Sequence, residues 1–285
     1  MEIKALQVKE LRDMSGVAMM ECKKALVECE GNIEKALDLL RSNSSLKAEK
    51  KASRVAADGV IRIIATDNYA TIIEINSETD FAAKDAGFIA FADEVATFIT
   101  NNKMNNAEEF LNTEIEEKRL SLVQTIGENI QLRRIETIDF NSSMSVGSYI
   151  HSDGKLATLV VTDSSESELA KDIAMHIAAS NPLCKSPEDI DDKVLEREKA
   201  IFETQARESG KDESIMEKMI EGKVQKFLAE VSLTSQAFIK DPDITVGSLL
   251  DDKKTEVIGY VRFKVGEGIE IESKSFADEV AEQLK

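Results

Sequence analysis

The hydrophobic and polar positions change period near residue 80, where a strand pattern gives way to a helix pattern. Residues 70–75 (ATIIEI) form an apolar run that only Glu74 interrupts, which predicts a mostly buried strand. After it, apolar residues recur on one helix face, at Phe88, Phe91, Ala92, Val95, Phe98 and Ile99. We therefore expect a helix over residues 81–99, capped by Thr79 or Asp80 and bent near Gly87.

Phe81 stands at the start of this predicted helix, beside an acidic residue, and two interpretations are open. As a hydrophobic staple it would fold back onto the core, as most phenylalanines do. As a peg it would hold a large apolar side chain at a fixed angle for a partner's pocket. The local pattern alone favours the staple.

The N-terminal residues up to about 41 predict three short helices. Their apolar positions are Val8 and Leu11; Met19, Cys22 and Leu26; and Ile33, Leu37 and Leu40. Met19 and Met20 fit either a docking patch or the core of this small bundle. We expect a polar break at Ser42–Ser45 and then a short basic connector helix over residues 47–54.

The period then becomes that of strands. Residues 60–64 and 69–76 flank Asp67-Asn68, a hairpin turn signal, and the predicted helices to about residue 126 and strand 130–138 complete a β-β-α-α-β unit. A weaker second unit follows, with strands near 147–150 and 157–160, a helix over 166–179 and a late closing strand over 256–264.

The sequence thus predicts an α+β protein with an N-terminal three-helix domain, two related β-β-α type core subdomains, an inserted helical hairpin and a C-terminal helix. The expected boundaries are 1–54 for the helical domain with its connector; 55–140 for the first subdomain; 141–186 and 229–265 for the second; 187–228 for the charged hairpin; and 266–285 for the C-terminal module. Gly266-Glu267-Gly268 is expected to be a flexible joint before the last helix, residues 275–284.

Charge and composition narrow the function. Thirty-six basic and fifty-four acidic residues give a net charge of −18, which disfavours direct contact with nucleic acid. Residues 1–10 lack the apolar region of a secretory signal, and no apolar stretch reaches membrane-spanning length. The three cysteines form no CxxC pair, which fits a reduced cytoplasm.

Motifs of catalysis are absent from the sequence. It contains no P-loop, no GxGxxG after a strand, no HExxH and no GxSxG. His151 and His176 have no cysteine or histidine partner at ligand spacing, so we expect neither a metal site nor a cofactor. The sequence indicates a protein that recognises other proteins rather than an enzyme.

Two stretches, residues 11–26 (LRDMSGVAMMECKKAL) and 79–88 (TDFAAKDAGF), closely resemble the bacterial translation elongation factor Ts family. Shorter matches follow in family order, at residues 126–129 (IGEN), 176–180 (HIAAS) and 266–269 (GEGI). The resemblance implies a ubiquitin-associated-like N-terminal domain, a two-part core and a helical arm that could form a homodimer or a heterotetramer. It also implies a guanine-nucleotide exchange factor for elongation factor Tu, with no active site of its own.

The resemblance also assigns roles to residues, and it favours the peg over the staple. Residues 80–83 (Asp80, Phe81, Ala82 and Ala83) would enter the GTPase beside its magnesium and phosphate site. Met19, Met20 and Lys23 would dock the N-terminal module on the nucleotide domain of the GTPase. The resemblance is less specific for Ile126, Gly127 and His151, which would contact the GTPase elsewhere. Two departures are Ala18, where the family usually has glycine, and Ala82, where it often has valine. A different class of function, an adaptor that binds proteins through its three-helix module, is the alternative.

Overall fold

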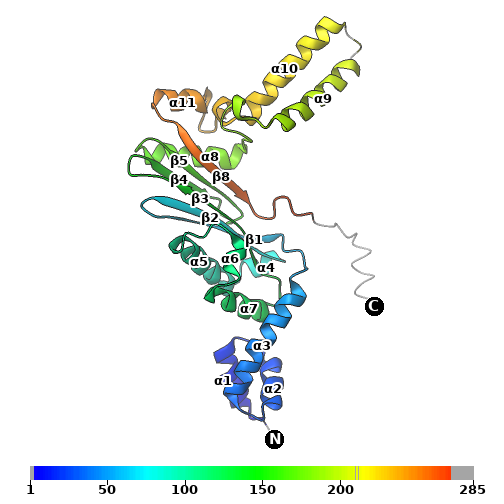
Figure 1. The fold of residues 1–285 in the computed structure, drawn as a ribbon, viewed down its shortest axis with the longest axis vertical. Helices are drawn as coiled ribbons and strands as arrows, with labels where there is room; N and C mark the ends of the chain where they lie inside the picture. Colours follow the sequence, from blue (N-terminus) through cyan, green and yellow to red (C-terminus); the bar gives the residue numbers. More distant parts are fainter. Residues whose placement is uncertain (1–2, 209, 211, 271–285) are drawn as a thin grey trace.

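The computed structural model describes residues 3–208, 210 and 212–270. It is elongated, with three N-terminal helices at one end, two small sheets in the middle and a helical hairpin at the other end (Figure 1). The predicted C-terminal helix, residues 275–284, lies outside the described residues. For the parts of the chain that are described, the α+β class and the order of the elements agree with the prediction.

The N-terminal module consists of three helices: α1 (Ala5–Ser15), α2 (Met19–Glu28) and α3 (Ile33–Lys51). Leu11, Cys22 and Leu26 are fully buried between them, as their helical spacing predicts. Asn32 caps α3, because its Oδ1 accepts a hydrogen bond from the backbone N–H of Lys35 at 3.0 Å. The expected three-helix arrangement is therefore present.

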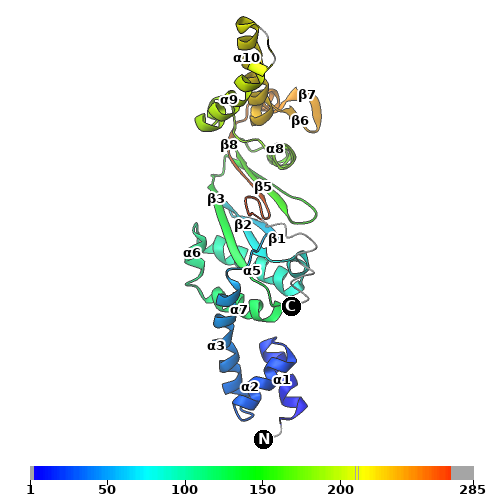
Figure 2. The same ribbon diagram turned by 90° about the vertical axis from the view of Figure 1, so that its right-hand side faces the viewer.

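The expected break at Ser42–Ser45 is wrong, because α3 continues through these residues to Lys51. Inside the helix, the hydroxyl group of Ser44 donates to the backbone oxygen of Arg41 at 2.5 Å, so this buried polar side chain is satisfied without ending the helix. Ala48 packs into the core of the first subdomain. The basic stretch is thus the second half of α3, and one straight element links the N-terminal module to the core (Figure 2).

The first core subdomain contains an antiparallel sheet in the order β1-β2-β3, formed by β1 (Asp58–Ala65), β2 (Tyr69–Ser77) and β3 (Gln131–Asp139). Between β2 and β3 the chain forms α4 (Asp80–Ala83), α5 (Ala86–Asn101), α6 (Ala107–Phe110) and α7 (Glu114–Ile126). Ile73 and Ile75 of β2 pack with Phe88 of α5 on one face. Ile72 packs against Leu159 of the second sheet on the other face, so β2 is buried along its whole length.

The second subdomain is an antiparallel sheet in the order β4-β5-β8, from β4 (Ser145–Ile150), β5 (Leu156–Thr162) and β8 (Val257–Lys264). Its outer face is covered by α8 (Ser167–Ser180), so the core has four layers: helices, sheet, sheet, helix (Figure 1, Figure 2). At Gly147 of β4, an added Cβ atom would lie 2.1 Å from the carbonyl carbon and oxygen of Ala170 in α8. The close approach of strand and helix therefore requires glycine.

The inserted hairpin consists of α9 (Asp192–Glu208) and α10 (Glu213–Val231), which project from the core (Figure 1). The rings of Phe202 and Phe227 meet edge to face with centroids 6.3 Å apart. Between the hairpin and β8 lie short elements that the sequence did not predict: η2 (Leu233–Ser235), β6 (Ala237–Phe238), β7 (Asp241–Thr245) and α11 (Val246–Asp252). Their apolar residues, among them Leu233 and Val246, enlarge the core beneath α8.

A buried ion cluster joins the first subdomain to the segment after β8. Glu74 is fully buried, and its carboxylate accepts hydrogen bonds from Arg133 at 3.0 Å, Arg134 at 2.5 Å and the backbone N–H of Gly266 at 2.9 Å. The charge is thus paired and its oxygens are satisfied, which is the condition for a stable buried carboxylate. The start of the expected flexible joint, Gly266, is fixed to β2 by this contact.

His176 in α8 fastens the base of the hairpin. The ring is fully buried, and its Nδ1 accepts from the backbone N–H of Ile239 at 3.2 Å, so Nε2 carries the proton donated to Oε1 of Gln236 at 2.9 Å. Gln236 in turn donates to the backbone oxygen of Glu230, near the end of α10, at 2.7 Å. The ring is therefore neutral in the folded protein.

Acidification should destabilise the fold through His176. Burial lowers the pKa of His176 below its ordinary value of 6.5, so below that pH the unfolded chain binds a proton that the folded chain does not. The free energy of unfolding should then fall as the pH drops below 6.5, until the pH reaches the folded pKa. Melting temperatures between about pH 7.5 and 5.5 should fall more in the wild type than in His176→Gln. Equal losses in both proteins would contradict this role.

Candidate partner-binding site

Phe81 is the most prominent feature of the site. It lies in α4 and is 83% exposed, the largest exposed fraction among the large hydrophobic side chains of the described residues. The next two residues, Ala82 and Ala83, are only 4% and 3% exposed. The helix is therefore anchored to the subdomain by its alanines while the aromatic ring points into solvent. The staple interpretation, in which Phe81 folds back onto the core, is wrong.

Local hydrogen bonds fix the single turn that carries Phe81. The Oγ1 atom of Thr79 accepts from the backbone N–H of Ala82 at 3.3 Å, which caps α4. The hydroxyl group of Ser77, the last residue of β2, donates to the backbone oxygen of Thr79 at 3.0 Å. These two hydrogen bonds join the end of the strand to the start of the helix, and they hold Phe81 in one position relative to the sheet.

The expected continuous helix over residues 81–99 is two helices. The first ends at Ala83, and Asp85 begins α5, because its Oδ1 accepts from the backbone N–H groups of Gly87 at 2.8 Å and Phe88 at 3.2 Å. The prediction assigned Thr79 or Asp80 to the long helix, whereas Thr79 caps only the short one. The break lies at Lys84-Asp85, just before the glycine that indicated a bend.

Asp80 is held next to the exposed ring as an anion. Its Oδ2 atom lies 2.6 Å from the Nζ atom of Lys84, one turn along the chain. This hydrogen bond, and to a smaller extent the charges of Lys84 and Lys155, holds the pKa of Asp80 below its usual range. The site therefore presents an aromatic ring beside a carboxylate that stays ionised at neutral pH.

The structure brings the end of α7, with Ile126 and Gly127, against this turn. Glu128 accepts two hydrogen bonds from Thr79, and the backbone N–H of Asn129 donates to Oε1 of Glu78 at 2.7 Å. Ile126 and Gly127 are half-buried beside them. Glu78, Glu128 and Asn129 are site residues that the sequence reasoning did not assign. The only signal for Glu128 and Asn129 was their place in the matching 126–129 stretch, and Glu78 directly precedes the matching stretch 79–88.

The turn between β4 and β5, which contains His151, lies on the same side of the molecule as Asp80. His151 is exposed, and its Nδ1 atom is 3.1 Å from Oδ1 of Asp153. In the same turn, Lys155 pairs with Asp58 of β1 at 2.8 Å, and its charge lowers the pKa of Asp80. The second subdomain thus contributes this turn to the surroundings of Phe81.

Met19 and Met20 form a second exposed apolar feature, at the start of α2. They are 48% and 65% exposed, and Lys23 is exposed on the same helix, so the interpretation that both methionines are core residues is wrong. The module contacts the core through Glu21, which accepts from Gln124 of α7 at 3.4 Å and pairs with Lys47 of α3. The sequence-assigned residues therefore lie on two separate surfaces, one on α2 and one around α4.

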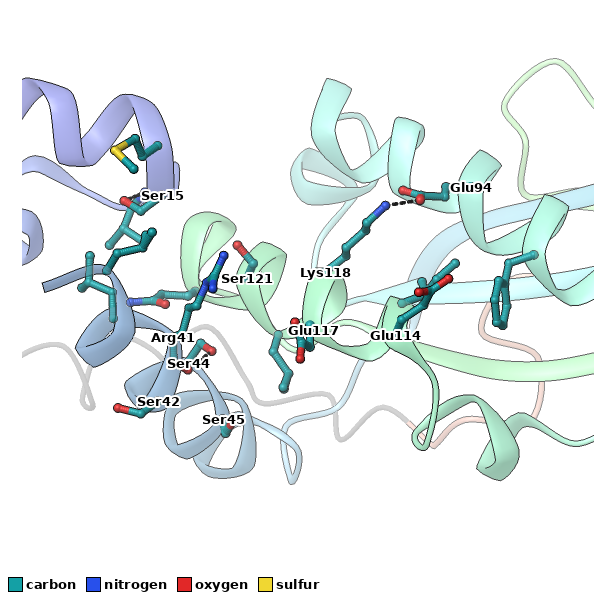
Figure 3. A pocket seen from close by; sticks show the side chains of 18 of the residues that line it. Ser15, Arg41, Ser42, Ser44, Ser45, Glu94, Glu114, Glu117, Lys118 and Ser121 are labelled. Carbon is teal, nitrogen blue, oxygen red and sulfur yellow. Dashed lines mark hydrogen bonds and ion pairs between the residues drawn. The ribbon is translucent and has the colours of Figure 1, made fainter. Parts of the chain in front are cut away.

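An open groove of about 1180 Å³ separates the N-terminal module from α5 and α7. The residues labelled in Figure 3 are all polar or charged, with Ser15 and Arg41 on the module and the Lys118–Glu94 ion pair on the core, and apolar residues such as Leu40 and Ile115 also line the groove. Neither Phe81 nor the two methionines line it. In the described ranges, no cluster of three or more potential metal ligands occurs, and no helix is long and apolar enough to cross a membrane.

The fold and site define an α+β protein of several modules whose candidate site is a protruding aromatic side chain on a hydrogen-bonded frame. The family model described as "Elongation factor TS" matches residues 78–267. Proteins named "Elongation factor Ts" from Hahella chejuensis and Saccharophagus degradans are 50% and 48% identical, covering 99% and 100% of this chain and 99% and 98% of their own lengths. One from Marinobacter nauticus is 47% identical over 98% of this chain and 96% of its own. The chain belongs to the elongation factor Ts family and is thus a translation elongation factor.

Proposed function

We propose that the chain is a guanine-nucleotide exchange factor that acts on elongation factor Tu in the cytoplasm and catalyses no chemical reaction itself. The observation that carries the proposal is the exposure of Phe81, at 83%, on a turn that hydrogen bonds of Thr79 and Ser77 hold in place. Aromatic anchors that enter a partner's pocket are typical of the residues that dominate protein–protein binding. Family membership supplies the partner.

In the proposed mechanism, exchange needs only differential binding. A factor that binds the nucleotide-free GTPase more tightly than the GDP form weakens GDP binding by the same ratio. Phe81 enters beside the magnesium site, with Ala82 and Ala83 close behind it, and Asp80 adds its negative charge. If Phe81 displaced the magnesium ion of the GTPase, the phosphates of GDP would lose part of the positive charge that holds them, and GDP would be released more readily.

The remaining assigned residues bind the GTPase but do not displace its magnesium ion. Met19, Met20 and Lys23 dock the N-terminal module on the nucleotide-binding domain of the GTPase, where flexible methionine side chains can fit an irregular surface. Ile126, Gly127 and His151 contact neighbouring parts of the partner from the two core subdomains. If these contacts form equally in every nucleotide state, they raise affinity without by themselves favouring release.

The experiment is release of a fluorescent GDP analogue from elongation factor Tu, with and without this chain, at low and high magnesium. We expect release to accelerate with the chain, and excess magnesium to oppose it. Calorimetric titration into the GTPase, nucleotide-free or loaded with GDP, should then give the tighter binding in the nucleotide-free state. Equal affinity in both states would contradict exchange and leave the adaptor function, because a ligand that binds all states equally shifts none of them.

A further inference from the structure

Both carboxylate oxygens of Glu128 accept hydrogen bonds from Thr79, the residue that caps the Phe81 turn. Its Oε2 atom accepts from the backbone N–H of Thr79 at 3.0 Å, and its Oε1 atom accepts from the Thr79 hydroxyl group at 2.6 Å. The two residues are 49 positions apart in the sequence. A carboxylate that accepts two hydrogen bonds from one residue fixes both the position and the rotation of that residue.

The second of these bonds determines which way the Thr79 hydroxyl group points. A hydroxyl group has one donor and two acceptor lone pairs, and here the donor is used by Glu128 while a lone pair accepts from the N–H of Ala82 at 3.3 Å. The helix that carries Phe81 is only four residues long, too short to be stable by itself. Its direction therefore depends on the cap, and the cap depends on Glu128.

Glu128 is itself well anchored on both sides. The backbone oxygen of Gly127 accepts from Nζ of Lys51 at the end of α3. The side-chain amide of Asn129 donates to the backbone oxygen of Arg54 at 2.9 Å, and its backbone N–H donates to Glu78 at 2.7 Å. The carboxylate of Glu128 thus ties the exposed turn to a fixed segment, which lies between α7 and β3.

We propose that Glu128 is a positioning residue for nucleotide exchange, which orients Phe81 by holding Thr79. The inference rests on the proposed function and deepens it, since it assigns to Glu128 a role that acts through Phe81. Loss of the carboxylate would leave Phe81 present but free to sample other directions, so fewer encounters would place the ring in the partner's pocket.

The test compares Glu128→Ala with Glu128→Gln in the complete chain, by GDP release from elongation factor Tu at increasing factor concentration. Glu128→Ala should lower the saturating release rate by about tenfold or more, since small misplacements of a working group are costly, while the half-saturating concentration changes little. Glu128→Gln should recover most of the rate, because its amide can accept from the Thr79 N–H and donate to the hydroxyl oxygen. Glu136→Ala, which removes an exposed glutamate from β3, controls for the change in net charge.

The Phe81→Ala and Phe81→Ala/Glu128→Ala proteins complete the test. If Glu128 acts only through Phe81, adding Glu128→Ala to Phe81→Ala should change the rate by less than about twofold. The inference would be overturned if the two substitutions slowed release independently, so that their effects multiplied in the double variant. It would also be overturned if Glu128→Ala released GDP at the wild-type rate while Phe81→Ala was slow. If Phe81→Ala itself exchanged at the wild-type rate, the proposed function of the ring would fail instead, so the two failures are distinguishable.

Discussion

Phe81→Ala should remove most of the exchange activity and leave the stability of the protein nearly unchanged. Burial of a phenylalanine side chain in a partner contributes about 1.5–3 kcal/mol, which corresponds to roughly a tenfold to hundredfold loss of rate. In the free protein the ring is 83% exposed, so its truncation should cost less than about 1 kcal/mol. The same truncation in a core costs about 3–5 kcal/mol, so the loss in free energy of unfolding distinguishes a core phenylalanine from one that binds a partner.

GDP release and thermal unfolding, measured on the same preparations, check this expectation. Leu111→Ala is the matched control, because Leu111 is also a large exposed apolar residue, at 55%, and lies in the turn after α6. It should leave both the rate and the melting temperature unchanged. A large fall in melting temperature for Phe81→Ala, with the exchange rate per folded molecule preserved, would show that the ring supports the fold rather than the partner.

The largest effect on stability is expected from Gly147→Ala. The new Cβ atom would lie 2.1 Å from the backbone of Ala170, far inside van der Waals contact, and backbone atoms cannot rotate away as a side chain can. Helix α8 must therefore move off β4, which loosens the buried contacts of Ile173 and Ile177 beneath it. Overpacking of this kind costs about 3 kcal/mol or more.

Thermal or denaturant unfolding measures this loss, and Gly222→Ala supplies its control. Gly222 lies in α10 with no atom within 4 Å of its added Cβ, so alanine there should stabilise the helix by up to about 1 kcal/mol. The two glycine-to-alanine changes are chemically identical, so opposite signs would isolate the close approach at Gly147. Equal stabilities of the two variants would show that α8 does not depend on that approach.

The sequence was most informative where one period extends over many residues. The apolar run at 70–75 is a buried strand, and the stripe from Phe88 to Ile99 is the buried face of α5. The sequence was least informative where the same polar side chains can occur either in a loop or inside a helix. Serines at 42–45 looked like a break, but Ser44 bonds back to its own helix. The elements β6, β7 and α11 are too short for any period to appear.

The candidate site also contains features that the sequence could predict and features that it could not. The exposure of Phe81 could not be decided from its neighbours, since an aromatic residue beside a cap is also the pattern of a staple, and only the family resemblance favoured the peg. The role of Glu128 could not be inferred from the sequence, because its link to Thr79 joins residues 49 positions apart and requires the fold to bring α7 against β2. Asp85 carried a local signal, an aspartate just before a helix stripe, that the prediction assigned to Thr79 or Asp80 instead.

The unbroken α3 makes the chain a bivalent ligand with a fixed span. Its 19 residues form a rod about 28 Å long that carries the N-terminal module, and the end of this rod is hydrogen-bonded to Gly127 beside the Phe81 turn. The methionine pair at the start of α2 is held against the rod by the ion pair between Glu21 and Lys47. Once either surface has bound, the other is held at a high effective concentration over its own target, and no linker entropy is lost. A rigid spacer of this kind engages at both ends only with a partner whose two pockets are the right distance apart. The chain would thereby distinguish conformations of its partner by length as well as by chemistry.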